Sequence, residues 1–129
     1  MSRFDGKVVL VTGASSGLGA ACVAKFASEG ALVYGVSRDL AKLEAMAAQV
    51  DGKVEVDTLD VSDPQACKAI VASCVERFGR LDVLVNNAGR HDFHATPDVS
   101  EEQWFHDLNT NLSGAFFLSQ AAIPHLLET

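Results

Sequence analysis

The sequence predicts an α/β protein in which helices cover both faces of a parallel sheet. Two observations predict this class: short apolar runs alternate with longer amphipathic stretches in the order βαβαβαβα, and a glycine-rich turn follows the first run directly. Strands that alternate with helices are joined by right-handed crossovers into a doubly wound sheet. The length of 129 residues predicts one domain over residues 1–129. Such a sheet usually has about six strands, so we expect this one to be truncated after four.

The first two strand–helix units span residues 7 to 50. Residues 7–11 form a continuous β-branched run, which is typical of a strand buried on both faces. The helix expected over residues 17–28 closes at Gly30, and the next apolar run predicts a strand at 32–36. Asp39 is suited to cap the helix that follows, which extends to about residue 50, because its carboxylate can accept a free N–H of the first turn.

The third unit and the fourth strand follow the same pattern. Residues 54–59 predict a strand, and the next helix begins at either Ser62 or Asp63, since both residue types are good N-caps. Gly79 is placed to end that helix, because glycine readily adopts the left-handed conformation found there. A fourth apolar run predicts a strand at 81–85.

A long helical region is expected from Ser100, which opens a capping-box spacing, to the end of the chain. Pro124 should end or kink that helix. Trp104 and Phe105 are expected to pack in the core or at a helix interface rather than on a ligand. The two histidines of segment 91–94 lack a strong third ligand nearby, so we expect a solvated loop there and no metal site.

Charge and cysteine content narrow the possible partners. The formal net charge of −7 argues against nucleic acid or an anionic membrane, and no apolar run approaches the length of a membrane span. Residues 91–129 hold six acidic residues, no basic ones and all four histidines, so this third of the chain is chemically distinct. Three cysteines without a secretory signal predict reduced thiols in a cytoplasmic protein.

The glycine-rich turn is the first motif that indicates a ligand. It reads Thr-Gly-Ala-Ser-Ser-Gly-Leu-Gly over residues 12–19, between the first strand and the first helix. Gly13 suits the tight turn, Gly17 leaves room for a diphosphate, and Gly19 permits close packing of helix and sheet. The free N–H groups of the helix would face the phosphates. Although the spacing is GxxxGxG and not GxGxxG, this context predicts dinucleotide binding on a Rossmann-like sheet.

Three further motifs complete a pattern. Asp60-Val61 follows the third strand, Asn-Asn-Ala-Gly occupies 86–89 at the end of the fourth, and Asn-Leu-Ser-Gly occupies 111–114 after Trp104. Together with the turn at 12–19, these motifs resemble the short-chain dehydrogenase/reductase family, and the resemblance extends along nearly the whole chain. The family's activity is hydride transfer between a nicotinamide cofactor and an alcohol or carbonyl substrate.

The resemblance implies roles for particular residues. The diphosphate and ribose would be held by Thr12, Gly13, Ser15, Gly17, Leu18 and Gly19; the adenine by Asp60 and the backbone of Val61; and the nicotinamide ribose by Asn87, Ala88 and Gly89. Asn111 would be the catalytic asparagine, which opens a helical turn and orders a proton-relay water. Alternatively, the Asn87 side chain mainly fixes the end of the strand by hydrogen bonds to the backbone, as we expect for Asn86. For Asn111 the alternative is that it only marks a kink in the helix.

Cofactor choice depends on the end of the second strand. An acidic side chain there accepts a hydrogen bond from the 2′-hydroxyl of NAD, whereas a basic one accommodates the 2′-phosphate of NADP. This chain has Ser37 followed by Arg38, so we expect NADP(H) to be favoured over NAD(H). The alternative is that Arg38 is solvated and that Asp39 partly cancels its charge.

The family's Tyr-x-x-x-Lys motif and its upstream Ser are missing from this sequence. The one tyrosine, Tyr34, lies in the second strand and is expected to pack in the sheet. Two hypotheses remain: an NADP(H)-dependent oxidoreductase for small alcohols or carbonyls, with the chain lacking that catalytic half, and a non-catalytic dinucleotide-binding or pairing module. GxxxGxG with NNAG disfavours an epimerase-like relative. The substrate and the reaction direction are not predicted by these motifs.

The short sheet has a consequence for association. The resemblance implies a strand order in which the first and fourth strands lie in the middle of the sheet, so a chain that ends after four strands leaves the fourth as an apolar edge. Four side chains of the last helix are then expected to be incompletely covered, namely Phe116, Phe117, Leu118 and Ile123. We therefore expect the isolated chain to self-associate or to be poorly soluble. The resemblance also implies a homo-oligomer in full-length members of the family.

Overall fold

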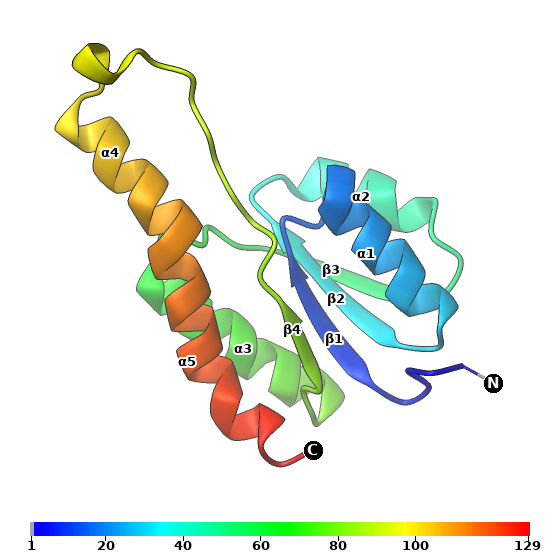
Figure 1. Cartoon of the computed structure of the whole chain (residues 1–129). Helices are drawn as coiled ribbons and strands as arrows, with labels where there is room; N and C mark the ends of the chain where they lie inside the picture. The colour runs from blue at the N-terminus through cyan, green and yellow to red at the C-terminus, as the bar shows by residue number, and fades with distance from the viewer. Residues whose placement is uncertain (1) are drawn as a thin grey trace.

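The computed structural model describes residues 2–129, in which four parallel strands form one sheet in the order β3-β2-β1-β4. The strands are β1 (Val8–Thr12), β2 (Leu32–Ser37), β3 (Lys53–Thr58) and β4 (Val83–Val85). This topology confirms the predicted doubly wound, Rossmann-like class (Figure 1). The fourth strand is shorter than expected: β1 begins at Val8, whose carbonyl accepts from Asp82 N at 3.0 Å, so the residues before Asp82 have no strand to pair with.

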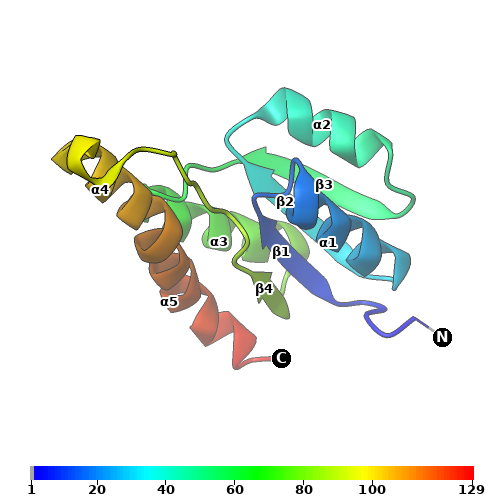
Figure 2. The same cartoon turned by 45° about the horizontal axis from the view of Figure 1, so that its top comes forward.

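The helices form the outer layers of the fold. They are α1 (Gly17–Ser28), α2 (Leu40–Ala48), α3 (Pro64–Phe78), α4 (Glu101–Leu108) and α5 (Gly114–Leu126), with a 3₁₀ turn η1 (Thr96–Asp98) and a π-helical turn η2 (Asn109–Ser113). Figures 1 and 2 show α1 and α2 on one face of the sheet and α3 and α5 on the other. Each face has its own apolar core. The sheet is therefore the middle layer of three, as the alternating sequence pattern predicted.

Local chemistry sets the helix ends. The Asp39 carboxylate accepts from Lys42 N at 3.1 Å and caps α2. Asp63, and not Ser62, caps α3 by accepting from two amides of its first turn. Gly79 ends that helix at φ +78°, in the left-handed region that glycine tolerates best.

The expected long C-terminal helix is interrupted. Ser100 forms the predicted capping box with Gln103 at the start of α4, but η2 separates α4 from α5 by a wider π-helical turn. The helix α5 continues two residues past Pro124 to Leu126, so the proline removes one helical hydrogen bond without stopping the helix at once.

Three of the four side chains on α5 are incompletely covered, as expected. Phe116 and Ile123 are about half exposed, at 58% and 51%, and Phe117 is half-buried against the α3 side of the core. Leu118 is buried, so the expectation of incomplete cover was wrong for this residue. The strand β4 lies at the edge of the sheet, as predicted.

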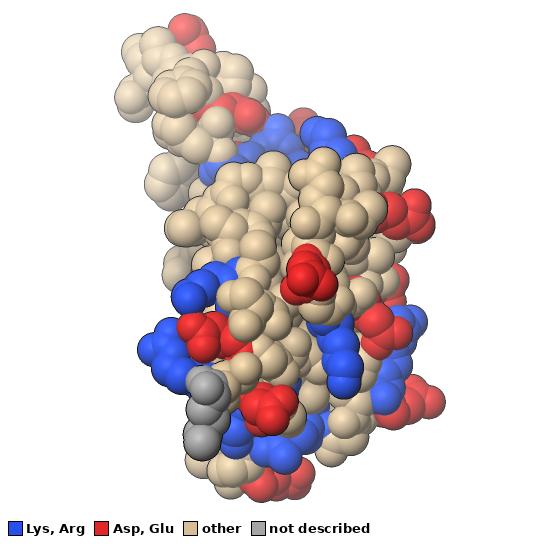
Figure 3. All heavy atoms as spheres, turned by 90° about the vertical axis from the view of Figure 1, so that its right-hand side faces the viewer, with Lys and Arg blue, Asp and Glu red and all other residues tan. Residues whose placement is uncertain are grey.

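The helix α4 projects beyond the sheet (Figure 1). As a result Trp104 and Phe105 are 59% and 55% exposed, so packing in the core was wrong as an expectation, and packing at a helix interface stays a prediction. Figure 3 shows acidic and no basic side chains on the projecting lobe, with Lys and Arg side chains gathered below it. In residues 2–129 there is no helix long and apolar enough to cross a membrane.

Candidate functional site

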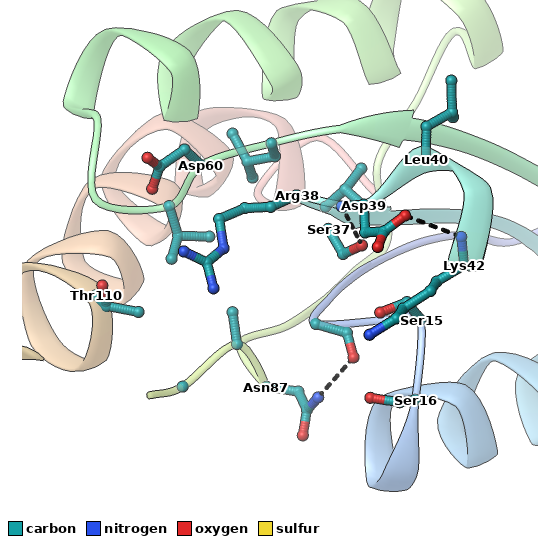
Figure 4. A pocket seen from close by; sticks show the side chains of 16 residues that line it. Ser15, Ser16, Ser37, Arg38, Asp39, Leu40, Lys42, Asp60, Asn87 and Thr110 are labelled. Carbon is teal, nitrogen blue, oxygen red and sulfur yellow. Dashed lines mark hydrogen bonds between the residues drawn. The ribbon is translucent and has the colours of Figure 1, made fainter. Parts of the chain in front are cut away.

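A cavity of about 720 Å³ opens at the carboxyl ends of the strands (Figure 4). Four strand-to-helix connections and the π-helical turn supply its lining: Gly13, Ser15 and Ser16 after β1; Val36, Ser37, Arg38, Asp39, Leu40 and Lys42 at β2 and α2; Leu59, Asp60 and Val61 after β3; Asn87, Ala88 and Gly89 after β4; and Thr110. In open α/β sheets this edge is where ligands bind. Nine of the thirteen residues predicted to contact a cofactor line this cavity.

The glycine turn has the backbone that a phosphate cradle needs. Gly13 and Gly17 adopt φ values of +62° and +55°, and the space beside Gly17 is open, with no atom within 4 Å of an added Cβ. Ser16 caps α1 without a side-chain hydrogen bond to its first-turn amides. Those amide donors are consequently free to face a diphosphate.

Gly19 has a different packing role from the one expected. A Cβ there would overlap the Gly13 carbonyl and would lie 2.6 Å from Asn87 Nδ2. The missing side chain thus makes room for the turn and for Asn87, rather than for contact of the helix with the sheet. Gly17, Leu18 and Gly19 lie beside the cavity and do not line it, and Leu18 is exposed.

Thr12 joins the turn after β1 to the turn after β4. Its side chain is buried, and its Oγ1 accepts from Asn87 N at 3.0 Å and from Ala88 N at 2.9 Å. The Asn87 amide in turn donates to the carbonyls of Thr12 and Gly13, at 3.2 Å each. Thr12 does not line the cavity itself, but its hydroxyl holds in place two residues that do. Asn87 locks the strand end, the alternative considered for it, while it also lines the cavity.

Asn86 joins β4 to the last helix. Its amide donates to Ser119 Oγ on α5 at 3.0 Å, so it has a structural contact, as expected, but with a side chain and not with the backbone. It does not line the cavity.

The end of β2 presents two basic side chains to the cavity. Figure 4 shows the Arg38 guanidinium turned into it from the strand end, and the Lys42 side chain extending from α2 toward Ser15. Sequence reasoning missed Lys42. The available signal was its position three residues after the N-cap Asp39, on the first turn of the helix that follows the cofactor-selecting strand.

Asp60 keeps its charge at this site. Ser62 donates from its hydroxyl at 2.6 Å and from its backbone at 3.0 Å to Asp60 Oδ1. These hydrogen bonds, together with the positive charge of Arg38, lower the pKa of Asp60 below its usual value, while burial opposes them. The next residue, Val61, packs closely on α5: a Cβ on Gly114 would lie 2.5 Å from the Val61 carbonyl, so only glycine fits there.

Asn111 lies in η2, so a widened helical turn is present where the resemblance implied one. Its side chain accepts from Arg90 N and donates to Arg90 O, both at 2.6 Å. Asn111 does not line the cavity, whereas the neighbouring Thr110 does. The Asn111 side chain ties the segment after β4 to the π-helical turn.

Arg90 belongs to a cluster that sequence reasoning did not find. Its guanidinium donates to Asp92 Oδ2 at 2.6 Å, lies 2.8 Å from His106 Nε2, and pairs with Asp107 at 3.5 Å. The Arg90 hydrogen bond lowers the pKa of Asp92 below its usual value. The partners His106 and Asp107 lie 16 and 17 residues away on α4, so no local pattern indicates them. The cluster fixes the 86–95 loop against α4.

Tyr34 cannot serve the cavity as an acid or base. The side chain is buried, its hydroxyl donates to Asp57 Oδ2 at 2.7 Å, and burial raises its pKa to about 12. This confirms the expected sheet-packing role. In the described part of the chain no group of three His, Cys, Asp or Glu side chains could hold a metal. The loop that carries His91 and His94 is exposed at both residues, so the expectation of a solvated loop is confirmed.

The family comparison agrees with this geometry. Residues 7–129 match the short chain dehydrogenase family. The chain belongs to that family. Short-chain dehydrogenases are NAD(P)-dependent oxidoreductases that act on CH–OH groups of small molecules, and the glycine turn, the Asn-Asn-Ala-Gly segment and the Asn-Leu-Ser-Gly segment described above all lie within the matched region.

Short-chain dehydrogenase relatives match almost the whole chain. A 3-oxoacyl-[acyl-carrier-protein] reductase of Thermotoga maritima is 38% identical over 98% of the chain and 52% of its own length. The meso-2,3-butanediol dehydrogenase of Serratia marcescens is 39% identical over 98% of the chain and 51% of its own length. The chain thus spans about half the length of these curated relatives.

Solved short-chain dehydrogenase structures share the fold closely. One from Burkholderia xenovorans superposes with a TM-score of 0.94 at 38% identity, covering 99% of this chain and 54% of the other. A metagenomic short-chain oxidoreductase in complex with NADP gives a TM-score of 0.91 at 35% identity, covering 97% of this chain and 58% of the other.

Proposed function

We propose that residues 1–129 act as one NAD(P)-binding domain of the short-chain dehydrogenase type, with NADP(H) as the favoured cofactor. The observation that carries this proposal is the single cavity that gathers the β1 turn, the β2 end, Asp60-Val61 and 87–89 at one edge of the sheet. The open space beside Gly17 and the free amides of α1 fit a diphosphate without any side chain having to move.

Each part of the cavity then has a role in holding the cofactor. The Gly13–Gly19 turn takes the diphosphate, and Asp60 accepts from the adenine amino group through the carboxylate that Ser62 orients. Asn87, Ala88 and Gly89 take the nicotinamide ribose. Asn111 lies outside this lining, with its side chain held by the Arg90 backbone, and the proton-relay role is the one that the family resemblance implies for it.

The preference for NADP(H) rests on the end of β2. Ser37 stands where an acidic residue would select the 2′-hydroxyl of NAD, and its hydroxyl accepts from Asp39 N at 3.3 Å. Arg38 pairs with no carboxylate among residues 2–129 and lines the cavity, so it is available to a phosphate. The competing interpretation, that Asp39 partly cancels the charge of Arg38, lacks the support of an ion pair between the two side chains within residues 2–129.

The reaction we propose for this site is hydride transfer between the nicotinamide and an alcohol or carbonyl substrate. The bound nicotinamide supplies the hydride chemistry, and this chain binds and orients it. The proton step needs an acid or base that this sequence does not contain, because its one tyrosine is the buried Tyr34. A missing general acid typically lowers the rate by about 10²–10⁴-fold, so this chain is expected to bind cofactor far better than it turns over.

A second candidate function follows from the same observation about Tyr34. The chain would be a non-catalytic module that holds a dinucleotide or pairs with a full-length relative. Exposed apolar side chains on α4 and α5, among them Trp104 and Phe116, support such pairing. For the full-length form of the family a homo-oligomer is the favoured state. We place either form in the cytoplasm without nucleic acid, on the strength of the free thiols and the net charge of −7.

Titration of the purified chain with NADPH and NADH, followed by nucleotide fluorescence, tests the proposal. Gly17→Val should abolish NADPH binding, because a branched side chain would fill the open space and strain the left-handed backbone. Gly79→Val is the matched control, since Gly79 has φ +78° and open space far from the cavity. A carbonyl-reduction assay on the same samples separates the two functions: measurable turnover by the chain alone would refute the non-catalytic module.

A further inference from the structure

Arg90 anchors the backbone of the segment that follows the Asn-Asn-Ala motif residues of β4. Within residues 2–129, the backbone of residues 89–94 forms two hydrogen bonds, both at Arg90 and both to the Asn111 side chain, at 2.6 Å each. The segment runs without regular structure from β4 toward α4 (Figure 1). Gly89 lines the cavity and is bonded directly to Arg90. The position of Arg90 therefore sets the position of this edge of the cavity.

The Arg90 side chain fastens that backbone to α4. Its Nη1 atom lies 2.8 Å from His106 Nε2, and its Nε atom lies 3.5 Å from the Asp107 carboxylate. Asp92, on the same segment as Arg90, accepts two hydrogen bonds from the guanidinium, at 2.6 and 3.1 Å. The Arg90 side chain is 33% exposed, so water and salt screen these contacts only in part.

Asp107 makes the guanidinium difficult to replace by water. Its Oδ1 atom is buried and accepts no hydrogen bond within residues 2–129, and Arg90 is the cation with which it pairs. Removing one partner of such a pair leaves the other charge uncompensated. Without the guanidinium, the Asp107 carboxylate would have to turn toward water, and α4 would lose its side-chain contact with the segment.

We propose that Arg90 is a positioning residue for the nicotinamide side of the cavity. Its side chain, fixed by α4, holds the backbone that places Gly89 and orients Asn111. This inference rests on the proposed function, because it assigns a support to the same cofactor site. Arg90 does not line the cavity and acts through these two neighbours. The adenine side is held by other contacts, among them the hydrogen bonds from Ser62 to Asp60.

The test compares two ligands on the whole chain: NADPH, and adenosine 2′,5′-bisphosphate, which lacks the nicotinamide ribose. Arg90→Met removes the guanidinium and keeps an apolar stem. If the positioned form of the segment falls to about a tenth of the population, NADPH binding should weaken by about tenfold, and binding of adenosine 2′,5′-bisphosphate should change by less than about twofold. Arg90→Lys keeps a positive charge near Asp107 and should recover part of the NADPH affinity.

Arg80→Met is the matched control. Arg80 also donates twice to a carboxylate, that of Asp82, at 2.6 and 2.8 Å. Both residues precede β4 and do not line the cavity, which opens at the other end of the strands. This variant should lose stability without losing affinity for either ligand. His106→Leu removes a single contact of the Arg90 side chain and should weaken NADPH binding selectively but by less, so it carries the test if Arg90→Met does not fold.

The outcomes separate the inference from the proposed function. If the native chain does not bind NADPH, the proposed function fails and the inference fails with it. If the native chain binds NADPH, but Arg90→Met and His106→Leu bind it as tightly or lose affinity for both ligands equally, only the role of Arg90 is overturned. Selective loss of NADPH affinity, with Arg80→Met unchanged in affinity, supports the inference.

Discussion

The support that Thr12 gives to the cavity can be tested by Thr12→Val, which keeps the shape of the side chain and removes its hydroxyl. The Thr12 Oγ1 accepts from Asn87 N and Ala88 N and donates to the Val85 carbonyl at 3.3 Å. An amide left without its partner costs about 1–3 kcal/mol when buried. Asn87 and Ala88 are half-buried, so the lower end applies to each, and the free energy of unfolding should fall by about 2–3 kcal/mol.

Thermal and denaturant unfolding of Thr12→Val measure this loss. For a domain of this size the expected fall in Tm is about 10 °C. Thr12→Ser, which keeps the hydroxyl, should lose less than half as much stability. Thr58→Val, at an exposed strand end with no side-chain hydrogen bond among the described residues, should change stability by at most about 0.5 kcal/mol. If Thr12→Val melts as the native chain does, Thr12 does not hold the two turns together.

Three further predictions concern packing, pH and association. Gly19→Ala should lower the free energy of unfolding by about 1–3 kcal/mol more than Gly79→Ala in denaturant melts. The added Cβ at position 19 would overlap the Gly13 carbonyl, whereas at position 79 it would have no atom within 4 Å. Equal losses in the two variants would contradict this. Burial raises the pKa of Asp82, but Arg80, Val8 N and Lys7 outweigh it and hold the pKa below its ordinary value. The unfolded chain then binds the proton more readily, so the free energy of unfolding should fall as pH drops below about 4. Asp82→Asn should reduce this pH dependence. Urea unfolding at a series of pH values measures it, and the same pH dependence in the variant and the native chain would contradict the prediction. Analytical ultracentrifugation should find self-association that Trp104→Glu weakens, because the indole is 59% exposed; a native chain that stays monomeric up to about 100 μM would rule it out.

Features set by neighbouring residues were predictable from the sequence. The turn at 12–19, the Asp39 cap and the Gly79 helix end each depend on a few adjacent residues, and the structure has all three where they were expected. The doubly wound parallel class was also predictable, because strands that alternate with helices allow few arrangements.

Features set by distant residues were not predictable in the same way. The Arg90 cluster joins a loop to α4, and the packing of Gly19 depends on Asn87, 68 residues further along the chain. Lys42 faces the cavity because α2 packs on the sheet beside the glycine turn, which helical periodicity alone does not specify. Packing of Trp104 in the core was one of the two expectations for it, yet α4 projects past the sheet and leaves the indole exposed.

The cavity at the carboxyl edge of the sheet is the centre of this account, and titration of the native chain with NADPH and NADH tests it most directly. Arg38 and Lys42 line that cavity, and the glycine turn offers free amides to a diphosphate. The account predicts saturable binding of one NADPH per chain, about tenfold or more tighter than NADH, which corresponds to about 1.4 kcal/mol. Equal affinity for the two cofactors, or no binding of either at millimolar concentration, would contradict it.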